Sequence, residues 1–298
     1  KDLHGECKYD PGGYFLVNGQ EKVVISIESM VDNKPMIFSK KDSGFSRGYY
    51  SFAHINSREN DWSDNLQIIT IKEKKNGSFV ISTSQFIDIP IFVMFRLLGV
   101  ESDKEIISCI SYDMNDVKLL NLLRPSIFYN FDAENNPIKT KEEAIEFMIT
   151  KLKKNRRISQ SDEELAKKQK RVYLEKLLLK NFFPHLSEDM PKKIRFLGYM
   201  INKLLNVILG RRKHDDRDSL QNKRIETPGV LISQLFRQNW KKLLNEIGKN
   251  FRKKNQSDDN PLNVIGQIRS NTIEQGIKTA LATGIWGIHK TKKGVAQS

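Results

Sequence analysis

The spacing of apolar residues changes near Pro90, and this change most constrains how the chain can fold. Before Pro90, short segments rich in β-branched and aromatic residues are separated by polar loops, a pattern typical of strands. After Pro90, apolar residues recur at helical spacing almost to the last residue. Strands gathered in one part of a chain and helices in another are typical of an α+β fold. The sequence therefore predicts an α+β fold in which the strands precede most of the helices along the chain.

Two dipeptides mark turns between the predicted strands. Asn18-Gly19 tolerates positive φ angles, so residues 14–27 are predicted to form a β-hairpin. Asn76-Gly77 is expected to connect the last pair of strands. The other strand-like segments are 36–38, 49–52 and 66–71 between these turns, and 79–81 after the second turn.

Helices are predicted from capping residues and from apolar periodicity. A helix over 91–98 should stop at Gly99, and Thr140 with Glu143 forms a capping box for a helix over 141–153. Ser161 with Glu164 begins another helix, in which Leu165, Val172, Leu174, Leu177 and Leu178 are mostly at helical spacing. Further helices are expected at 191–209, at 229–254 and from Pro261 to Leu281. The helix at 229–254 is amphipathic, and the residues expected on its inner face are Leu231, Leu235, Trp240, Leu243, Leu244 and Ile247.

Composition excludes several classes of protein. No apolar run is long enough to span a membrane, and the first residues do not resemble a signal peptide, so a secreted or membrane protein is not expected. Cys7 and Cys109 are far apart and have no nearby partner for a zinc site or a disulfide framework. The chain also has no Rossmann or P-loop motif.

Positive charge is concentrated towards the C-terminus. The net charge is +14, and residues 211–298 hold 18 Lys and Arg against 8 Asp and Glu. This asymmetry suggests a polyanionic partner, although a solvated helix face is an equally simple explanation. Lys290, Lys292 and Lys293 form a basic loop that suits phosphate contacts, with a solvated tail as the alternative.

The run His214-Asp215-Asp216-Arg217-Asp218 is the most reactive-looking cluster in the sequence. Its carboxylates could bind Mg²⁺, which would make the chain a stand-alone nuclease using Asp215, Asp216 and Asp218. Interleaved acids and bases more often form an ion-pair network, here with Lys223 and Arg224. A non-catalytic interaction module is a third interpretation.

Five groups of motifs are spread over nearly the whole chain. They are Gly12–Ile25; Asp88–Gly99 with Tyr112–Asp116; Phe183–His185 with Leu197–Leu204; Asp215–Asp218 with Asn222–Arg224; and Ala280–Gly287 with Gly294–Gln297. In order and spacing they resemble the second-largest, β-type subunit of multisubunit DNA-dependent RNA polymerases, of the eukaryotic polymerase II, archaeal and large-DNA-virus type. Ile27 departs from the family, which has Gln there, and the loop Ile288–Lys293 is shorter than in the eukaryotic enzyme.

The resemblance implies a division into domains. Residues 1–30 would end the first segment of the protrusion domain, 31–222 would form the lobe domain, 223–283 would return to the protrusion, and 284–298 would begin the fork region. The acidic run then lies where the chain re-enters the protrusion. This position favours a structural ion-pair network of Asp215, Asp216, Arg217, Asp218, Lys223 and Arg224.

The resemblance also implies a function. The lobe and protrusion of the family form a wall of the DNA cleft, and the fork loop borders the RNA–DNA hybrid. By this resemblance, the residues expected to contact nucleic acid are Lys22, Lys290, Lys292, Lys293 and Gln297. The partners would be DNA, the hybrid, the largest subunit and other polymerase subunits, with no membrane.

No catalytic residue is expected in this fragment, because the family's catalytic aspartates belong to the largest subunit. The fragment itself is expected to bind no cofactor, whereas Mg²⁺ and Zn²⁺ are expected in the complete polymerase. The location would be the nucleus for a cellular protein, or the host cytoplasm or the virion for a viral one.

Overall fold

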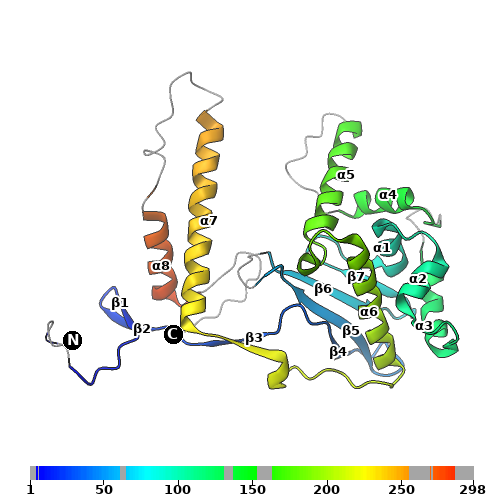
Figure 1. Cartoon of the computed structure of the whole chain (residues 1–298), viewed down its shortest axis with the longest axis horizontal. Coiled ribbons are helices and arrows are strands. Elements are labelled where there is room, and N and C mark those ends of the chain that lie inside the picture. The colour runs from blue at the N-terminus through cyan, green and yellow to red at the C-terminus, as the bar shows by residue number, and fades with distance from the viewer. Residues whose placement is uncertain are drawn as a thin grey trace. The chain divides into compact units, whose positions relative to one another are not determined.

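The structure is a computed structural model that describes residues 5, 7–60, 65–130, 137–152, 163–254, 269 and 271–285. The chain divides into two compact units. One is Met30–Asn222, here called the inserted unit; the other combines Lys1–Ser29 with Lys223–Ser298 and is called the flanking unit. Sheets and helices occur together (Figure 1), and the predicted α+β fold is confirmed.

The inserted unit is built on an antiparallel sheet whose strands pair in the order of the sequence. Along the two central strands, residues alternate between buried and more exposed, so one face of the sheet lies in the core. The predicted strands are confirmed, and Gly77 turns the chain with a φ of 78°. The strands are β4 (Met36–Lys41), β5 (Tyr49–Ser57), β6 (Gln67–Glu73), β7 (Phe79–Ser82) and β8 (Ile89–Pro90).

The helices of the inserted unit begin directly after this sheet. Helix α1 (Ile91–Leu98) is buried along its whole length, and it ends as predicted at Gly99, whose φ is 106°. Both α1 and α6 (Met190–Ile208) pack against strands of the sheet. The other helices are α2 (Asp103–Ile110), α3 (Val117–Phe128), α4 (Lys141–Lys151) and α5 (Glu163–Lys180).

Local signals in the sequence account for the ends of α4 and α6. Thr140 and Glu143 form the predicted capping box, each side chain accepting a hydrogen bond from the other's backbone N–H. Gly210, with a φ of 73°, follows the last turn of α6 as predicted. In α5 the predicted first residue, Ser161, lies outside the described residues. Leu174, Leu177 and Leu178 of α5 are buried, whereas Val172 is 49% exposed.

Helices α2 and α6 approach each other closely at a glycine. A Cβ atom placed on Gly198 would lie 2.1 Å from the carbonyl oxygen of Cys109. Real side chains do not tolerate such a distance, so this contact requires glycine. The close approach brings the apolar face of α6 into the core, where Leu197 and Ile201 are fully buried.

The flanking unit contains the predicted hairpin. Strands β1 (Tyr14–Val17) and β2 (Gln20–Val23) pair in antiparallel fashion. Asn18 and Gly19 between them have φ values of 53° and 76°, as a tight two-residue turn requires. A second pair of strands joins β3 (Ile27–Met30) to β9 (Lys223–Glu226), two segments far apart in the sequence.

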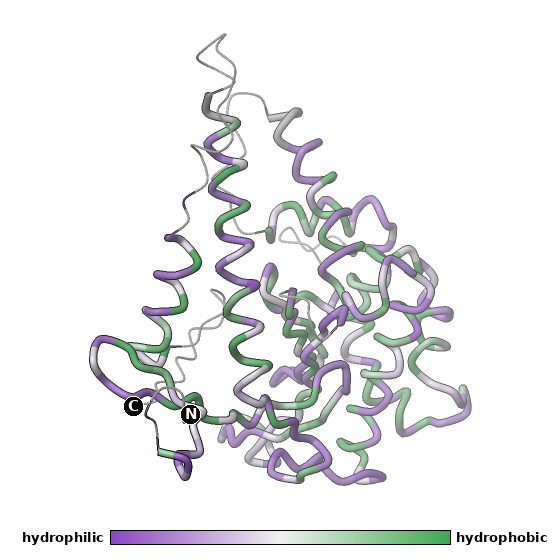
Figure 2. The backbone as a smooth tube through the Cα atoms, turned by 60° about the vertical axis from the view of Figure 1, so that its left-hand side comes forward, coloured by the Kyte–Doolittle hydropathy of each residue, from purple (hydrophilic) through white to green (hydrophobic). Residues whose placement is uncertain are grey.

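The long helix α7 (Pro228–Lys254) lies beside α8 (Asn271–Thr283) in the flanking unit (Figure 1). Hydrophobic and hydrophilic residues alternate along α7 (Figure 2), and Leu231, Leu235 and Leu243 are buried as predicted. The expectation that Trp240 and Leu244 lie inside is wrong for this chain, since they are 47% and 51% exposed. The residues 261–268, predicted to begin the last helix, lie outside the described residues.

Candidate functional site

The segment after α6 is attached to the first strand of the sheet through Asp215. The backbone N–H of Asp215 donates to the carbonyl oxygen of Ile37 at 2.9 Å. The backbone N–H of Ile37 donates in turn to Oδ2 of Asp215 at 2.8 Å. Asp215 thereby satisfies both backbone groups of Ile37 and fixes the path of the chain against β4.

A buried lysine of α6 completes this attachment. Nζ of Lys203 lies 3.1 Å from Oδ2 of Asp215, and the two side chains are only 5% and 13% exposed. The same Nζ also donates to the carbonyl oxygen of Pro35. On the solvent side, Arg212 donates to Oδ1 of Asp215 at 3.1 Å. Both carboxylate oxygens of Asp215 therefore have cationic partners.

The pKa shifts of the pair agree with this arrangement. Burial alone would raise the pKa of Asp215, but the N–H of Ile37 and the ammonium of Lys203 outweigh it, so the pKa lies below its ordinary value. Burial lowers the pKa of Lys203, and the carboxylate of Asp215 opposes that shift. Asp215 is consequently ionised at neutral pH and serves as a structural anion.

The rest of the acidic run is fixed by other contacts. The guanidinium of Arg217 lies 4.2 Å from the centre of the Phe38 ring, a cation–π contact. Oδ1 of Asp216 accepts a hydrogen bond from the backbone N–H of Asp218 at 2.9 Å. The ring of His214 has Nε2 at 3.1 Å from Oγ of Ser51. His214 and Arg217 thus attach the run to the sheet of the inserted unit, whereas the hydrogen bond between Asp218 and Asp216 lies within the run.

The two basic residues expected in the same network follow in β9 of the flanking unit. Lys223 pairs with Glu28 of β3 at 2.8 Å, and Arg224 donates to the carbonyl oxygen of Lys223 at 2.8 Å. The sequence interpretation missed the central cation, Lys203. The sequence feature that could have identified Lys203 as a buried cation is its position between the apolar pairs Met200-Ile201 and Leu204-Leu205, on an otherwise buried helix face.

The geometry does not favour the alternative of a metal-dependent nuclease. Within the part of the chain that the structure describes, no group of three His, Cys, Asp or Glu side chains could hold a metal ion. Asp215 is already committed to Lys203, Arg212 and Ile37 through both of its carboxylate oxygens. A metal ion there would have to displace two cations from a nearly buried position.

The residues expected to contact nucleic acid are only partly described. Lys22 lies half-buried in β2, where its register partner is Phe15 of β1. Lys290, Lys292, Lys293 and Gln297 lie outside the described residues. The grouping of these five residues on one surface therefore stays a prediction. Among the helices that the structure describes, none is long and apolar enough to cross a membrane.

Comparison with known proteins covers nearly the whole chain. A family model described as "RNA polymerase Rpb2, domain 2" matches residues 32–226. DNA-directed RNA polymerase subunit 2 of Acanthamoeba polyphaga mimivirus is 39% identical over 311 residues, which cover 99% of this chain and 25% of that protein. RPB2 of DNA-directed RNA polymerase II from Eremothecium gossypii is 34% identical over 98% of this chain and 24% of its own length.

The chain is also similar to an archaeal RNA polymerase subunit over nearly its whole length. DNA-directed RNA polymerase subunit Rpo2 of Saccharolobus solfataricus is 29% identical over 98% of this chain and 24% of its own length. The chain thus spans about a quarter of the length of the curated relatives it matches. The match of the family model to residues 32–226 shows that the chain belongs to the family of second-largest subunits of DNA-directed RNA polymerases.

Proposed function

We propose that this chain forms part of the wall of the DNA cleft in a DNA-directed RNA polymerase. Residues 31–222, nearly the whole inserted unit, form the lobe, residues 1–30 and 223–283 are part of the protrusion, and residues 284–298 begin the fork region. One observation carries this proposal. The family model for domain 2 matches residues 32–226, nearly the same range as the compact unit Met30–Asn222. A domain delimited by sequence similarity and a unit delimited by packing thus coincide.

In this proposal the chain acts without catalytic residues of its own. Polymerisation belongs to the assembled enzyme, in which the largest subunit and other subunits complete the active site, and Mg²⁺ and Zn²⁺ are expected in that complete polymerase. The buried Lys203–Asp215 pair supports a structural role for the acidic run. The enzyme would work in the nucleus of a cell, or in the host cytoplasm or virion of a virus.

The proposed contacts with DNA and the RNA–DNA hybrid are Lys22, Lys290, Lys292, Lys293 and Gln297. The lysines act through phosphates rather than base edges, because a polymerase must pass every sequence. The excess of 18 basic over 8 acidic residues in 211–298 supports this assignment. In the described part of this region, Lys241, Lys242 and Lys249 of α7 are exposed and add to the positive surface.

The test replaces Lys290, Lys292 and Lys293 together by glutamine in the assembled polymerase. Binding to a DNA–RNA hybrid scaffold is measured at several salt concentrations. If all three lysines neutralise phosphates, the slope of log K against log salt falls by roughly 2 to 3 units, equally for different sequences.

A control variant changes the net charge by the same amount elsewhere. Lys104, Lys118 and Lys176 are exposed on α2, α3 and α5 of the inserted unit, and their replacement by glutamine should leave the slope nearly unchanged. An unchanged slope in the first variant, or an effect limited to one template sequence, would remove the three lysines from the nucleic-acid interface.

A further inference from the structure

The face of the sheet that lies away from α1 and α6 carries a row of aromatic side chains. Along β5, Ala53 and Ile55 pack into the main core with these helices, so the alternating residues of the strand lie on the opposite face. Successive rings on that face are 5.5 to 6.5 Å apart between their centres. In order, this aromatic row consists of Phe45, Tyr50, Phe52, Phe38 and His54.

The pairing of the strands explains why these rings meet. Tyr50 and Phe52 are two residues apart in β5 and therefore share one face. Phe38 of β4 is the register partner of Phe52, so the row continues across the two strands. Phe38 is only 5% exposed, and the guanidinium of Arg217 lies over its ring. Phe45, Tyr50 and Phe52 are half-buried, so these three rings remain partly accessible.

Lysines flank the aromatic row on either side. Lys40 of β4 is the register partner of Tyr50, and it is exposed without an ion pair to another described residue. Lys72 of β6 is the register partner of Phe52. Residues opposite each other in antiparallel strands belong to the same face, so both lysines border the rings. Accessible rings beside basic side chains are typical of surfaces that bind nucleic acid.

The acids near the row do not neutralise all of its lysines. Lys72 and Lys74 share one carboxylate, that of Asp88, at 2.7 and 3.6 Å. Lys75 lies 4.0 Å from Asp42, and the side chain of Lys75 is 67% exposed. With the exposed lysine of β4, four lysines therefore face two carboxylates, which leaves an excess of two positive charges.

A pocket of about 450 Å³ opens at one end of the row. Phe45 and Tyr50 form part of its wall, and a pocket of this size can hold a nucleobase with its sugar. Glu73 also lines the pocket, but its carboxylate is paired with Arg47. The basic residues of the wall are Lys72, Lys74 and Lys75.

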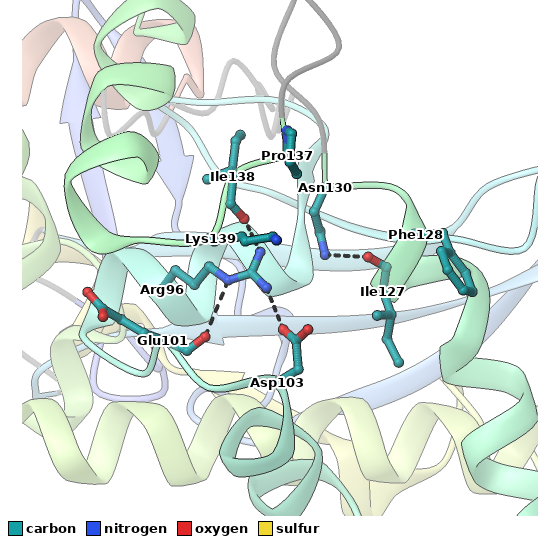
Figure 3. Close-up of a pocket in the computed structure, with 9 residues that line it drawn as sticks. All are labelled: Arg96, Glu101, Asp103, Ile127, Phe128, Asn130, Pro137, Ile138 and Lys139. Atoms are coloured by element: carbon teal, nitrogen blue, oxygen red, sulfur yellow. Dashed lines mark hydrogen bonds and ion pairs between the residues drawn. The ribbon is translucent and has the colours of Figure 1, made fainter.

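The pocket where α1 and α3 end differs in its charge (Figure 3). Its guanidinium, that of Arg96, donates to Asp103 and to the carbonyl oxygen of Ile138, so this cation is already committed. Phe128, which is 63% exposed, and Lys139 also line this pocket. It therefore offers one ring and one further lysine without a charge excess, and it provides a control.

We propose that the face of the aromatic row binds single-stranded nucleic acid. An unpaired base stacks on Phe45 and Tyr50, and the neighbouring phosphates contact the lysines. The inference rests on the proposed function, because a polymerase subunit works beside nucleic acid. A double helix hides the flat faces of its bases and would use the lysines alone, whereas a single strand can stack its bases on rings whatever the sequence.

The test compares two single strands that differ only in their bases. A labelled thymidine oligonucleotide of about 15 nucleotides and an abasic strand of the same length are titrated into the 298-residue chain, and binding is followed by fluorescence anisotropy. The thymidine strand should bind at least about 5-fold more tightly, the value of one stacked base. Phe45→Leu/Tyr50→Leu should remove this preference and leave binding of the abasic strand unchanged, because leucine keeps apolar bulk without a ring.

Other variants separate the rings from the charges and from folding. Phe45→Leu alone, in the loop between β4 and β5, should reduce the preference for bases while the paired strands stay intact. Lys40→Gln/Lys75→Gln should weaken both strands and lower the slope of log K against log salt by roughly 1 to 1.5 units. The control Phe128→Leu/Lys139→Gln should keep the full preference for the thymidine strand.

Three results would overturn the inference. They are equal binding of the two strands by the unchanged chain, a preference for bases that persists in Phe45→Leu/Tyr50→Leu, and an equal weakening of a DNA duplex by that variant. The proposed function fails separately, through an unchanged salt slope when Lys290, Lys292 and Lys293 are replaced in the assembled polymerase. That measurement does not involve the rings, so the two failures can be distinguished.

Discussion

Replacement of Lys203 by methionine tests whether the buried ion pair holds the acidic run to the sheet. Methionine has an unbranched apolar side chain of nearly the same length as the stem of lysine, with sulfur in place of Cδ, and it lacks the ammonium group. The change deletes the contact of Nζ with Oδ2 of Asp215 at 3.1 Å and the hydrogen bond to the carbonyl oxygen of Pro35. Asp215 keeps the N–H of Ile37 and the guanidinium of Arg212.

The expected loss of stability follows from these partners. Removing one member of a buried ion pair costs about 3–5 kcal/mol when the other charge is left alone. Since Asp215 retains two donors, we expect a loss of about 2–3 kcal/mol for Lys203→Met. The double variant Lys203→Met/Asp215→Asn should be less destabilised than the sum of the single variants, with a coupling of about 1–3 kcal/mol.

Lys192→Met is the matched control on the same helix. Lys192 pairs with Asp189 at 3.0 Å, but the two side chains are 69% and 38% exposed. Such a surface pair contributes about 0–1 kcal/mol, so the same chemical change should have little effect. A large loss of stability in Lys203→Met and a small loss in Lys192→Met would show that burial of the ion pair causes the difference.

The assay combines global and local measurements. Urea unfolding followed by circular dichroism gives the free energy of unfolding, and hydrogen exchange of the Ile37 and Asp215 amides reports on the attachment itself. Exchange at both amides should accelerate in Lys203→Met. Unfolding within about 0.5 kcal/mol of the wild type, together with unchanged exchange, would refute the reasoning, because surface substitutions behave in this way.

Three other outcomes are expected. Gly198→Ala should destabilise the chain by at least about 1–3 kcal/mol in urea unfolding, because its Cβ would collide with the carbonyl oxygen of Cys109, whereas Gly229→Ala, with open space around it, should be nearly neutral. Burial, aided by the charge of Lys193, lowers the pKa of His185 to about 4, below the roughly 6.5 of an unfolded chain. Stability should therefore be complete above about pH 6.5 and fall as the pH drops towards about 4, and His185→Gln should flatten the dependence of the urea midpoint on pH. Finally, the purified chain should not extend a primed RNA on a DNA template, and extension without other subunits would contradict its proposed non-catalytic role.

Local signals in the sequence predicted the elements that depend on a few adjacent residues. Asn18-Gly19 specified the hairpin, and Thr140 with Glu143 specified the start of α4, because turns and caps are decided by near neighbours. The exposure of Trp240 was not predictable in the same way. Apolar periodicity gives the apolar face of α7 but not how much of that face another element covers.

The sequence predicted the candidate site only in part, for a similar reason. The acidic run was recognisable as charged and structurally constrained, but its main partner, Lys203, comes from α6 and meets Asp215 only in the folded chain. A lysine within an apolar helix face was the available signal, and it does not identify its own counterion.

The pairing of β3 with β9 has a consequence for the order of folding. These strands are separated in sequence by the inserted unit, so an unfolded chain would have to close a very long loop before they could meet. The N–H of Val31 donates to the carbonyl oxygen of Asn222 at 3.0 Å, so the folded inserted unit holds its own two ends together. Once it has folded, the entropy of that closure has already been lost, and β3 and β9 are as near to each other as the arms of a hairpin. During synthesis, folding of the inserted unit would therefore bring β3 and β9 together and allow the flanking unit to form this pair of strands, although they are far apart in the sequence.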